Sequence, residues 1–347
     1  MTQRRFGLIV AAGLMAGSLL AQTNTSAGPT AEIYHGLADK KMPEITDIIP
    51  GLNIGVLVEV EAEYVRQGGK DTSDAKLSTM EFGADFKPVD WAEGHILFLW
   101  EEGTTEPIDL DEATITMGKT ETIPLFMTAG RQYVPFGVFN SHFVSDPLVQ
   151  VLGETRATAV LAGYENEILT ASVGAFRGNQ IGQDKVNNTV GALVMRPYEG
   201  IEFGMYAMSD LGESKTLRDE TRKECEDYEK APGVGGYASL SAWLLHLDAE
   251  VLGATKAFQA GIFKEDAELK PRAWNVELAV RPIERLELAG RIEGGKDLLP
   301  AVERQFGGAA SFGIVENLTL TVEYLHAQYE DDTEAADAVR GKLAARF

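Results

Sequence analysis

The sequence predicts an all-β fold: a transmembrane up-and-down antiparallel β-barrel of about sixteen strands, with a short N-terminal periplasmic segment before it. Three observations carry this prediction. Apolar residues alternate with polar ones along most of the chain, long polar connections alternate with short turns, and the N-terminus has the features of a secretory signal. The chain also ends on an aromatic residue, Phe347, in a stretch from Val339 that alternates between apolar and polar residues. Such a terminal strand is typical of outer-membrane barrels.

The N-terminus predicts export from the cytoplasm. Arg4 and Arg5 precede an apolar run, Phe6–Ala21, and a polar stretch follows it. A basic region, a short apolar region and small residues are the parts of a signal peptide. The run is shorter than the ~18–20 apolar residues of a spanning helix. We therefore predict a signal peptide over residues 1–21, a periplasmic leader or partial plug over 22–50, and an outer-membrane β-barrel over 51–347. A disordered tail is the open alternative for residues 22–50.

The strands are predicted from their period of two. In the first one, Ile54–Tyr64, apolar residues alternate with Glu59, Glu61 and Glu63, so that one face can meet lipid and the other water. Similar segments follow at Lys76–Lys87, Ala92–Glu101, Asp111–Gly118, Leu125–Phe136, Arg156–Glu165, Ile168–Gly178, Lys185–Arg196, Ile201–Ser209, Val234–Leu244, Leu245–Gly253, Arg272–Arg281, Leu286–Gly294, Arg304–Gly313, Leu318–Glu330 and Val339–Phe347.

The connections between these segments fall into two sets. The short ones are turns rich in Pro, Asp, Glu, Asn and Gly, and they comprise Lys87–Trp91, Arg196–Gly200, Arg281–Arg285 and Val315–Asn317. The long polar ones are Gln67–Ala75, Glu102–Leu110, Gly137–Thr155, Asn179–Asp184, Asp210–Gly233, Ala254–Pro271, Gly295–Glu303 and Asp331–Ala338. Their alternation is expected of a barrel with one periplasmic and one extracellular end, and it favours a membrane barrel over a soluble sandwich or propeller.

The composition argues against several functions. The chain of 347 residues has a formal net charge of -22, which disfavours nucleic-acid binding. Cys225 is the only cysteine, so no internal disulfide can form. The sequence has no P-loop, G-x-S-x-G elbow, H-E-x-x-H or C-x-x-C motif. We therefore predict no enzymatic activity, no catalytic residues, no cofactor and no nucleic-acid partner.

The sequence also predicts no metal centre. The histidines fall in separate segments without the local spacing of a metal site, and we interpret each as a solvated polar residue: His35, His95, His142, His246 and His326. The acidic stretch Tyr329–Glu334 lacks the glycine and the ordered spacing of an EF-hand.

The segment Ala129–Leu148 is the richest in chemistry. Arg131 lies in a predicted strand, and a charge facing lipid at mid-membrane costs roughly 2–4 kcal/mol, so we expect it to face the lumen. The Pro135–Gly137 break ends the strand and begins a long loop, which can fold into a barrel and narrow it. The predicted pore-lining residues are Glu59, Glu61, Glu63, Glu81, Asp85, Glu101, Arg131, Glu277, Arg291 and Glu293, with His142 and Asp146 on the loop.

A series of short motifs in this part of the chain resembles the LbtU-type siderophore porins of the bacterial outer membrane. They are Asp71–Asp74, Glu106-Pro107, Asp111–Thr116, Ala129–Arg131, Val134–Gly137, Ser145–Leu148 and Gly153–Arg156. The resemblance is most specific over residues 50–165 and architectural afterwards. It implies a sixteen-stranded barrel that assists passage of an iron-chelating siderophore. The chain lacks the long charged N-terminal helix of many members, and no ligand-binding residue is carried over.

The sequence therefore predicts an outer-membrane channel for a siderophore or other small polar solutes, with outer-membrane lipid and a small polar solute or ferric siderophore as partners. A general diffusion porin with a preference for cations is the alternative, because most predicted lumen residues are acidic. An outer-membrane barrel enzyme and a structural or adhesive barrel are rivals of other classes. The oligomeric state stays open, a homotrimer included.

Overall fold

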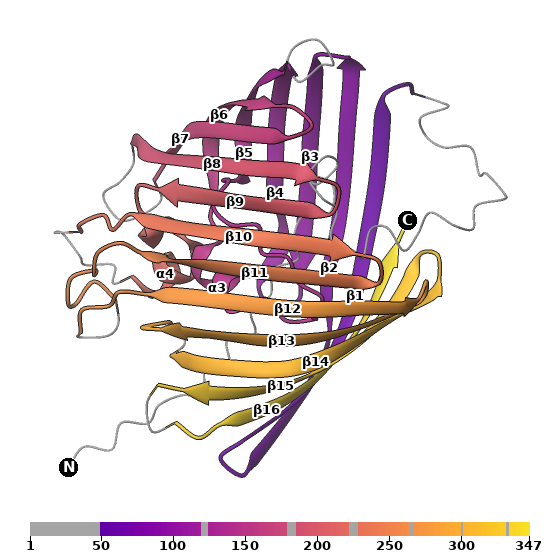
Figure 1. The fold of residues 1–347 in the computed structure, drawn as a ribbon, viewed down its shortest axis with the longest axis vertical. Coiled ribbons are helices and arrows are strands. Elements are labelled where there is room, and N and C mark those ends of the chain that lie inside the picture. Colours follow the sequence, from indigo (N-terminus) through magenta and orange to yellow (C-terminus); the bar gives the residue numbers. More distant parts are fainter. Residues whose placement is uncertain are drawn as a thin grey trace.

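The computed structural model describes residues 49–118, 124–178, 185–221, 228–263, 267–299, 301–330 and 333–347. The predicted signal peptide and most of the predicted periplasmic leader lie outside these residues. The described chain forms one closed antiparallel barrel in which each strand pairs with its neighbours in sequence and β1 pairs with β16 (Figure 1). The predicted fold class and the number of about sixteen strands are confirmed.

The barrel wall contains the strands β1 to β16. Their bounds are β1 Leu52–Gln67, β2 Lys70–Val89, β3 Ala92–Glu101, β4 Thr105–Gly118, β5 Leu125–Tyr133, β6 Arg156–Glu165, β7 Leu169–Arg177, β8 Val186–Tyr198, β9 Ile201–Met208, β10 Gly233–Ala242, β11 Leu245–Ala254, β12 Arg272–Ile283, β13 Leu286–Lys296, β14 Val302–Val315, β15 Leu318–Tyr329 and β16 Ala336–Arg346. The described helices are α3 (Leu148–Gly153), the 3-10 turn η1 (Leu211–Glu213) and α4 (Lys215–Glu220).

Two of the predicted long connections are mostly strand. Pairing of β1 with β2 continues to Gln67 and Lys70, so only Gly68 and Gly69 form the turn. Both glycines have positive φ, at 60° and 70°, as a type I′ hairpin turn requires. In the same way β4 begins at Thr105, well inside the predicted loop Glu102–Leu110. The prediction of long loops at these two positions was wrong, because the polar residues there continue the hydrogen-bonded pairing of the two strands.

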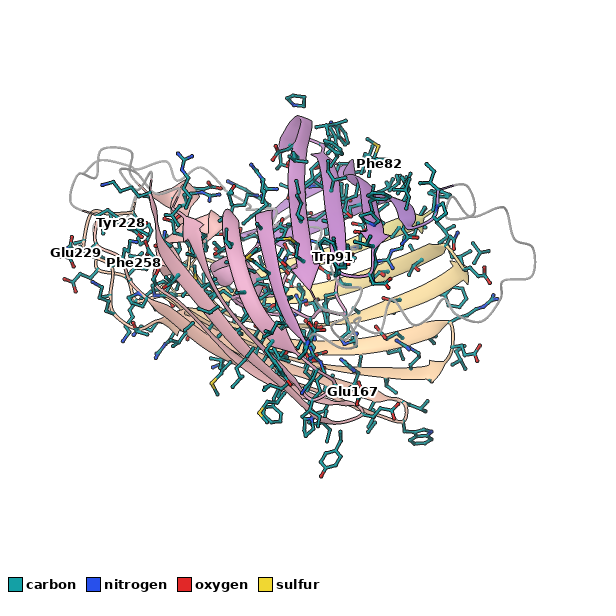
Figure 2. All side chains as sticks on the ribbon, turned by 90° about the horizontal axis from the view of Figure 1, so that it is seen from above. Phe82, Trp91, Glu167, Tyr228, Glu229 and Phe258 are labelled. Carbon is teal, nitrogen blue, oxygen red and sulfur yellow. The ribbon has the colours of Figure 1, made fainter. Side chains whose placement is uncertain are left out.

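The other long connections gather at one end of the barrel. Tyr228 and Glu229 from the β9–β10 connection lie there with Phe258 from the β11–β12 connection, whereas Trp91 and Glu167, in short turns, lie away from them (Figure 2). The exposed aromatics Trp91, Tyr198 and Trp243, which are 56%, 74% and 96% exposed, belong to the short turns or their borders. Amphipathic rings at such positions favour a membrane interface.

The outer face of the barrel is apolar. In β9, Phe203 and Met205 are 41% and 63% exposed, whereas the adjacent Glu202 and Tyr206 are 6% and 5% exposed. The same alternation leaves large apolar side chains exposed around the wall, among them Val60, Phe82, Ile115, Val173, Leu278 and Val322. An outward apolar face of this extent is what a barrel presents to lipid. No helix among the described residues is long and apolar enough to cross a bilayer.

One side of the lumen is filled by an apolar core. Segments of the β5–β6, β9–β10 and β11–β12 connections supply Phe136, Leu152, Leu211 and Phe258, which are all at most 2% exposed and belong to one hydrophobic cluster. α3 packs against β11, β12, β13 and α4, and Figure 1 shows both helices among the strands. This core fixes the position of the β5–β6 connection, in which the candidate site lies.

Candidate functional site

The β5–β6 connection crosses the inside of the barrel. We call residues 134–155 the lumen loop. It leaves β5 through Gly137 (φ 104°) and Phe139 (φ 56°), and these left-handed conformations turn the chain away from the strand direction. It then contacts inward-facing side chains of β11, β12, β13 and β15. The predicted insertion of this loop into the barrel is confirmed.

Carboxylates on the wall hold the loop by its backbone. Their oxygens accept hydrogen bonds from loop amides: Glu250 from Val138 (3.0 Å) and Phe139 (2.8 Å), Glu277 from His142 (2.7 Å), Glu323 from Val144 (2.6 Å) and Ser145 (3.0 Å), and Glu293 from Leu148 (2.5 Å). Hydrogen bonds from amides to an ionised acceptor are stronger than neutral ones. A cavity of only about 10 Å³ remains where the loop meets Asp248 and Glu250, so contact there is close.

Arg291 is the cation at the centre of this contact. Its side chain is fully buried and pairs with Glu277 at 2.8 Å and Glu293 at 3.3 Å. It also donates to the Ser145 carbonyl oxygen at 2.9 Å and to the Ser145 hydroxyl at 3.2 Å, and its guanidinium lies 4.2 Å from the centre of the Phe143 ring. A buried charge is stable only when it is paired and hydrogen-bonded in this way.

His142 joins the loop to two further carboxylates. Its Nδ1 lies 2.9 Å from Glu287 Oε1 and its Nε2 lies 3.3 Å from Asp248 Oδ2. Burial lowers the pKa of His142, but the two carboxylates raise it by more than burial lowers it. The resulting pKa is about 9, above the usual 6.5. His246 Nε2 lies 2.8 Å from the same Asp248 Oδ2. The expectation that His142 is solvated was wrong, because the residue is only 4% exposed.

Next to these contacts, the loop faces the seam between β16 and β1, since β15 is paired with β16. Asp146 lies close enough to Lys342 for their charges to interact, and Lys342 Nζ is 3.3 Å from Glu59 Oε1. Glu61 is the register partner of Lys342 and Glu63 that of Arg340. These side chains are partly exposed except for Glu59, which is buried. We call this set of residues the seam; its carboxylates outnumber its cations.

The predicted pore-lining residues therefore separate into groups. Glu277, Arg291 and Glu293 are at most 3% exposed and hold the loop, whereas Glu61, Glu63 and Asp146 lie at the seam. Glu81 and Glu101 are 3% and 2% exposed, and Asp85 Oδ1 lies 2.7 Å from His95 Nδ1.

Arg131 lies apart from the loop residues with which it was grouped. In the strand register it is opposite Ala113 and Thr158. Its guanidinium donates to Asp109 Oδ2 at 3.2 Å, an oxygen that also accepts from Arg156 at 3.2 Å. The structure thus places Arg131 with Asp109, and Asp146 with Lys342.

Four carboxylates of the site were missed by sequence reasoning. Asp248, Glu250, Glu287 and Glu323 all contact the loop. Each lies in a predicted strand at an inward position of the alternation, the same signal that selected Glu277. The alternation of apolar and polar residues does not predict which loop atom each carboxylate contacts.

Comparison with known sequences shows relatives that match only part of this chain. No family model matches the chain. A UPF0422 protein of Coxiella burnetii is 25% identical over 204 residues, which cover 55% of this chain and 44% of that protein. A UPF0422 protein of Legionella pneumophila is 36% identical over 70 residues, which cover 20% of this chain and 13% of that protein. The matches thus span less than half the length of either relative.

Comparison with solved structures shows the fold. An anion-selective porin from Comamonas acidovorans superposes with a TM-score of 0.64 at 10% identity, covering 85% of this chain and 99% of that one. OmpF of Salmonella typhi in complex with daunomycin gives 0.62 at 12% identity over 85% and 97% of the two chains. OmpT of Vibrio cholerae in a trimer form gives 0.57 at 10% identity over 86% and 100%. The chain therefore has the barrel fold of porins, and its apolar outer face is that of a bacterial outer-membrane protein.

Proposed function

We propose that the protein is an outer-membrane diffusion channel for small polar solutes and that it prefers cations. One observation carries the proposal: the lumen loop crosses the barrel and is fixed to the β11–β15 wall, while its Asp146 faces the seam. A loop held in this position narrows the route through a barrel, and the charges around the narrow part set which ions pass.

The charges at the seam favour cations. Glu59, Glu61, Glu63 and Asp146 face Lys342 and Arg340, so negative charge is in excess. Arg340 is further balanced by its ion pairs with Glu63 and with Glu323, the latter at 3.0 Å. A permeating cation thus meets a net negative constriction, whereas an anion meets repulsion.

Conductance of the refolded protein in planar bilayers tests this function. In a salt gradient, the reversal potential should have the sign of cation preference. Asp146→Asn and Glu61→Gln should each reduce that preference, and Lys342→Gln should increase it. Glu167→Gln, in an exposed turn, is the matched control and should change nothing. Absence of conductance would contradict the channel and leave a structural or enzymatic barrel; anion preference would contradict the role of the seam.

We propose a ferric siderophore as the narrower identity of the solute. The motif resemblance between residues 71 and 156 supports it. A ferric siderophore is large and often anionic, and the acidic seam repels anions, so the proposal is restricted to neutral or cationic ferric siderophores. Added to the same bilayers, a purified ferric siderophore should interrupt the current, whereas a neutral sugar of similar size should not. Equal effects of the two, or no effect of either, would leave the general diffusion porin.

The oligomeric state of this chain stays open, and a homotrimer is one candidate. OmpT of Vibrio cholerae, which shares the fold, is described in a trimer form. Chemical cross-linking of the protein in native membranes, followed by denaturing electrophoresis, would show trimers or monomers directly.

A further inference from the structure

We propose that His142, His246 and Asp248 form a binding site for a divalent transition-metal ion, with Zn²⁺ as the probe. The site lies where the lumen loop contacts β11. The sequence analysis did not predict it. The inference is independent of the proposed channel function, because it rests on three side chains and their neighbours alone.

The three ligand atoms converge on one point. One nitrogen from each imidazole and one carboxylate oxygen all lie within 4.8 Å of one another. Asp248 Oδ2 is 3.3 Å from His142 Nε2 and 2.8 Å from His246 Nε2. Two ligands bound to one zinc ion at about 2.0–2.1 Å in tetrahedral geometry lie about 3.3 Å apart. The two separations between a histidine nitrogen and the carboxylate oxygen are therefore already near the value that a bound ion needs, and the two histidine nitrogens lie within 4.8 Å of each other.

The remaining polar atom of each ligand has its own partner. His142 Nδ1 lies 2.9 Å from Glu287 Oε1, His246 Nδ1 lies 2.5 Å from the Ser241 hydroxyl, and Asp248 Oδ1 accepts from Asn140 Nδ2 at 2.9 Å. The imidazole rings are 5.3 Å apart between centroids and inclined at 70°. Such outer partners orient the rings, as in many protein metal sites. Both Nε2 atoms face Asp248 Oδ2, and His246 Nε2 also lies 3.3 Å from the Ser239 hydroxyl.

The side chains around the three ligands carry net negative charge, and the partly exposed His246 gives an ion access to the site. The His142 and Asp248 side chains are 1% and 6% exposed, whereas that of His246 is 17% exposed. Glu287 adds negative charge, which is partly balanced by Arg281 at 3.1 Å. Two imidazoles and one carboxylate favour zinc or a related transition metal over calcium or magnesium, which prefer oxygen ligands. An ion here would keep an open coordination position for water.

An ion bound at this site would join the lumen loop to the wall. His142 belongs to the loop, whereas His246 and Asp248 belong to β11. The two segments are more than a hundred positions apart in the sequence. Metal binding should therefore make the folded barrel more resistant to unfolding, since it stabilises only the state in which the loop is in place.

Metal binding to the refolded full chain tests the proposal. After treatment with a chelator and dialysis, titration calorimetry should show one Zn²⁺ bound per chain. His246→Gln and Asp248→Asn should each weaken binding at least tenfold. His326→Gln is the matched control: His326 also contacts a carboxylate, Asp337 at 2.9 Å, but lies outside the cluster, so its loss should leave binding unchanged. No Zn²⁺ binding by the wild-type chain, or equal binding by all variants, would overturn the proposal.

A second measurement needs no variant and so does not depend on variant folding. Histidine modification by diethyl pyrocarbonate, located by mass spectrometry on the native chain, should slow at His246 when Zn²⁺ is present and stay unchanged at His326. Equal modification rates at His246 with and without Zn²⁺ would contradict the site, whatever the calorimetry of the variants.

Discussion

The carboxylate of Glu154 is buried where the lumen loop returns to the barrel wall. Its Oε2 accepts from Gln150 Nε2 at 2.7 Å, and its carbonyl oxygen accepts from the Lys215 amide at 3.0 Å. Burial raises the pKa of Glu154 from 4.5 to about 7, although the Gln150 hydrogen bond and the Lys215 charge lower it. Between about pH 4.5 and pH 7, the folded state therefore holds a proton that the unfolded chain has released.

This raised pKa makes stability depend on pH. Protonated Glu154 contributes to the stability of the folded state. This contribution is fully present below the unfolded-state pKa near 4.5 and is lost as pH rises through the folded-state pKa of about 7. At about 1.4 kcal/mol for each pKa unit, ionised Glu154 costs roughly 3 kcal/mol above that range. Glu154→Gln should thus raise the free energy of unfolding at pH 8 by up to roughly that amount and change it little at pH 4. Denaturant unfolding at both pH values measures this, with Glu167→Gln as the exposed control. Destabilisation by Glu154→Gln at pH 8 would contradict the argument.

At the scale of elements, the lumen loop is held by charge as well as by apolar packing. Arg291 on β13 lies between Glu277 and Glu293, and all three side chains are fully buried. Each partner also binds a loop amide. One buried cation thus links the two carboxylates to each other and to the loop, so the loop and the β12–β13 wall should unfold together.

Removal of the Arg291 charge should lower the free energy of unfolding of the barrel. Arg291→Met leaves buried carboxylates without their partner, and breaking a buried ion pair in this way costs about 3–5 kcal/mol. Denaturant unfolding of the refolded barrel should show this loss. Arg66→Met is the matched control, because Arg66 pairs with Asp71 at 3.6 Å on the exposed β1–β2 hairpin, where an ion pair contributes only about 0–1 kcal/mol. Equal losses in the two variants would show that Arg291 does not hold the loop.

At the scale of the whole molecule, the barrel has two unlike ends. Long connections with an internal apolar core occupy one end, and short turns with exposed aromatics occupy the other. In outer-membrane barrels the long loops face outward from the cell and the short turns face the periplasm. This asymmetry predicts the orientation of the protein in its membrane.

Two single-cysteine variants test the orientation. In a Cys225→Ser background, Glu229→Cys places a thiol at the long-connection end and Glu167→Cys places one at the short-turn end (Figure 2). Both positions are exposed, Glu229 with 63% of its side chain accessible. An impermeant maleimide added to intact cells should label only the first, and should label both after the outer membrane is permeabilised. The reverse pattern would invert the orientation.

The sequence by itself determined the strands, their faces and the parity of most connections, because each strand carries its own alternation of lipid-facing and inward-facing residues. It misplaced Gln67–Ala75 and Glu102–Leu110, where polar residues continue a hairpin beyond the apolar stretch. It also identified Glu277, Arg291 and Glu293 as inward-facing. Their partners were decided only by the tertiary structure.

Closure of the barrel brings the lumen loop across to strands far along the chain. His142 meets Asp248 and Glu287 across 106 and 145 positions, and Asp146 meets the β16–β1 seam. No local pattern contains such distances, since they depend on how the ends of the sheet join and on where the apolar core positions the loop. For that reason scattered histidines and ordinary inward carboxylates became one site only in the folded barrel.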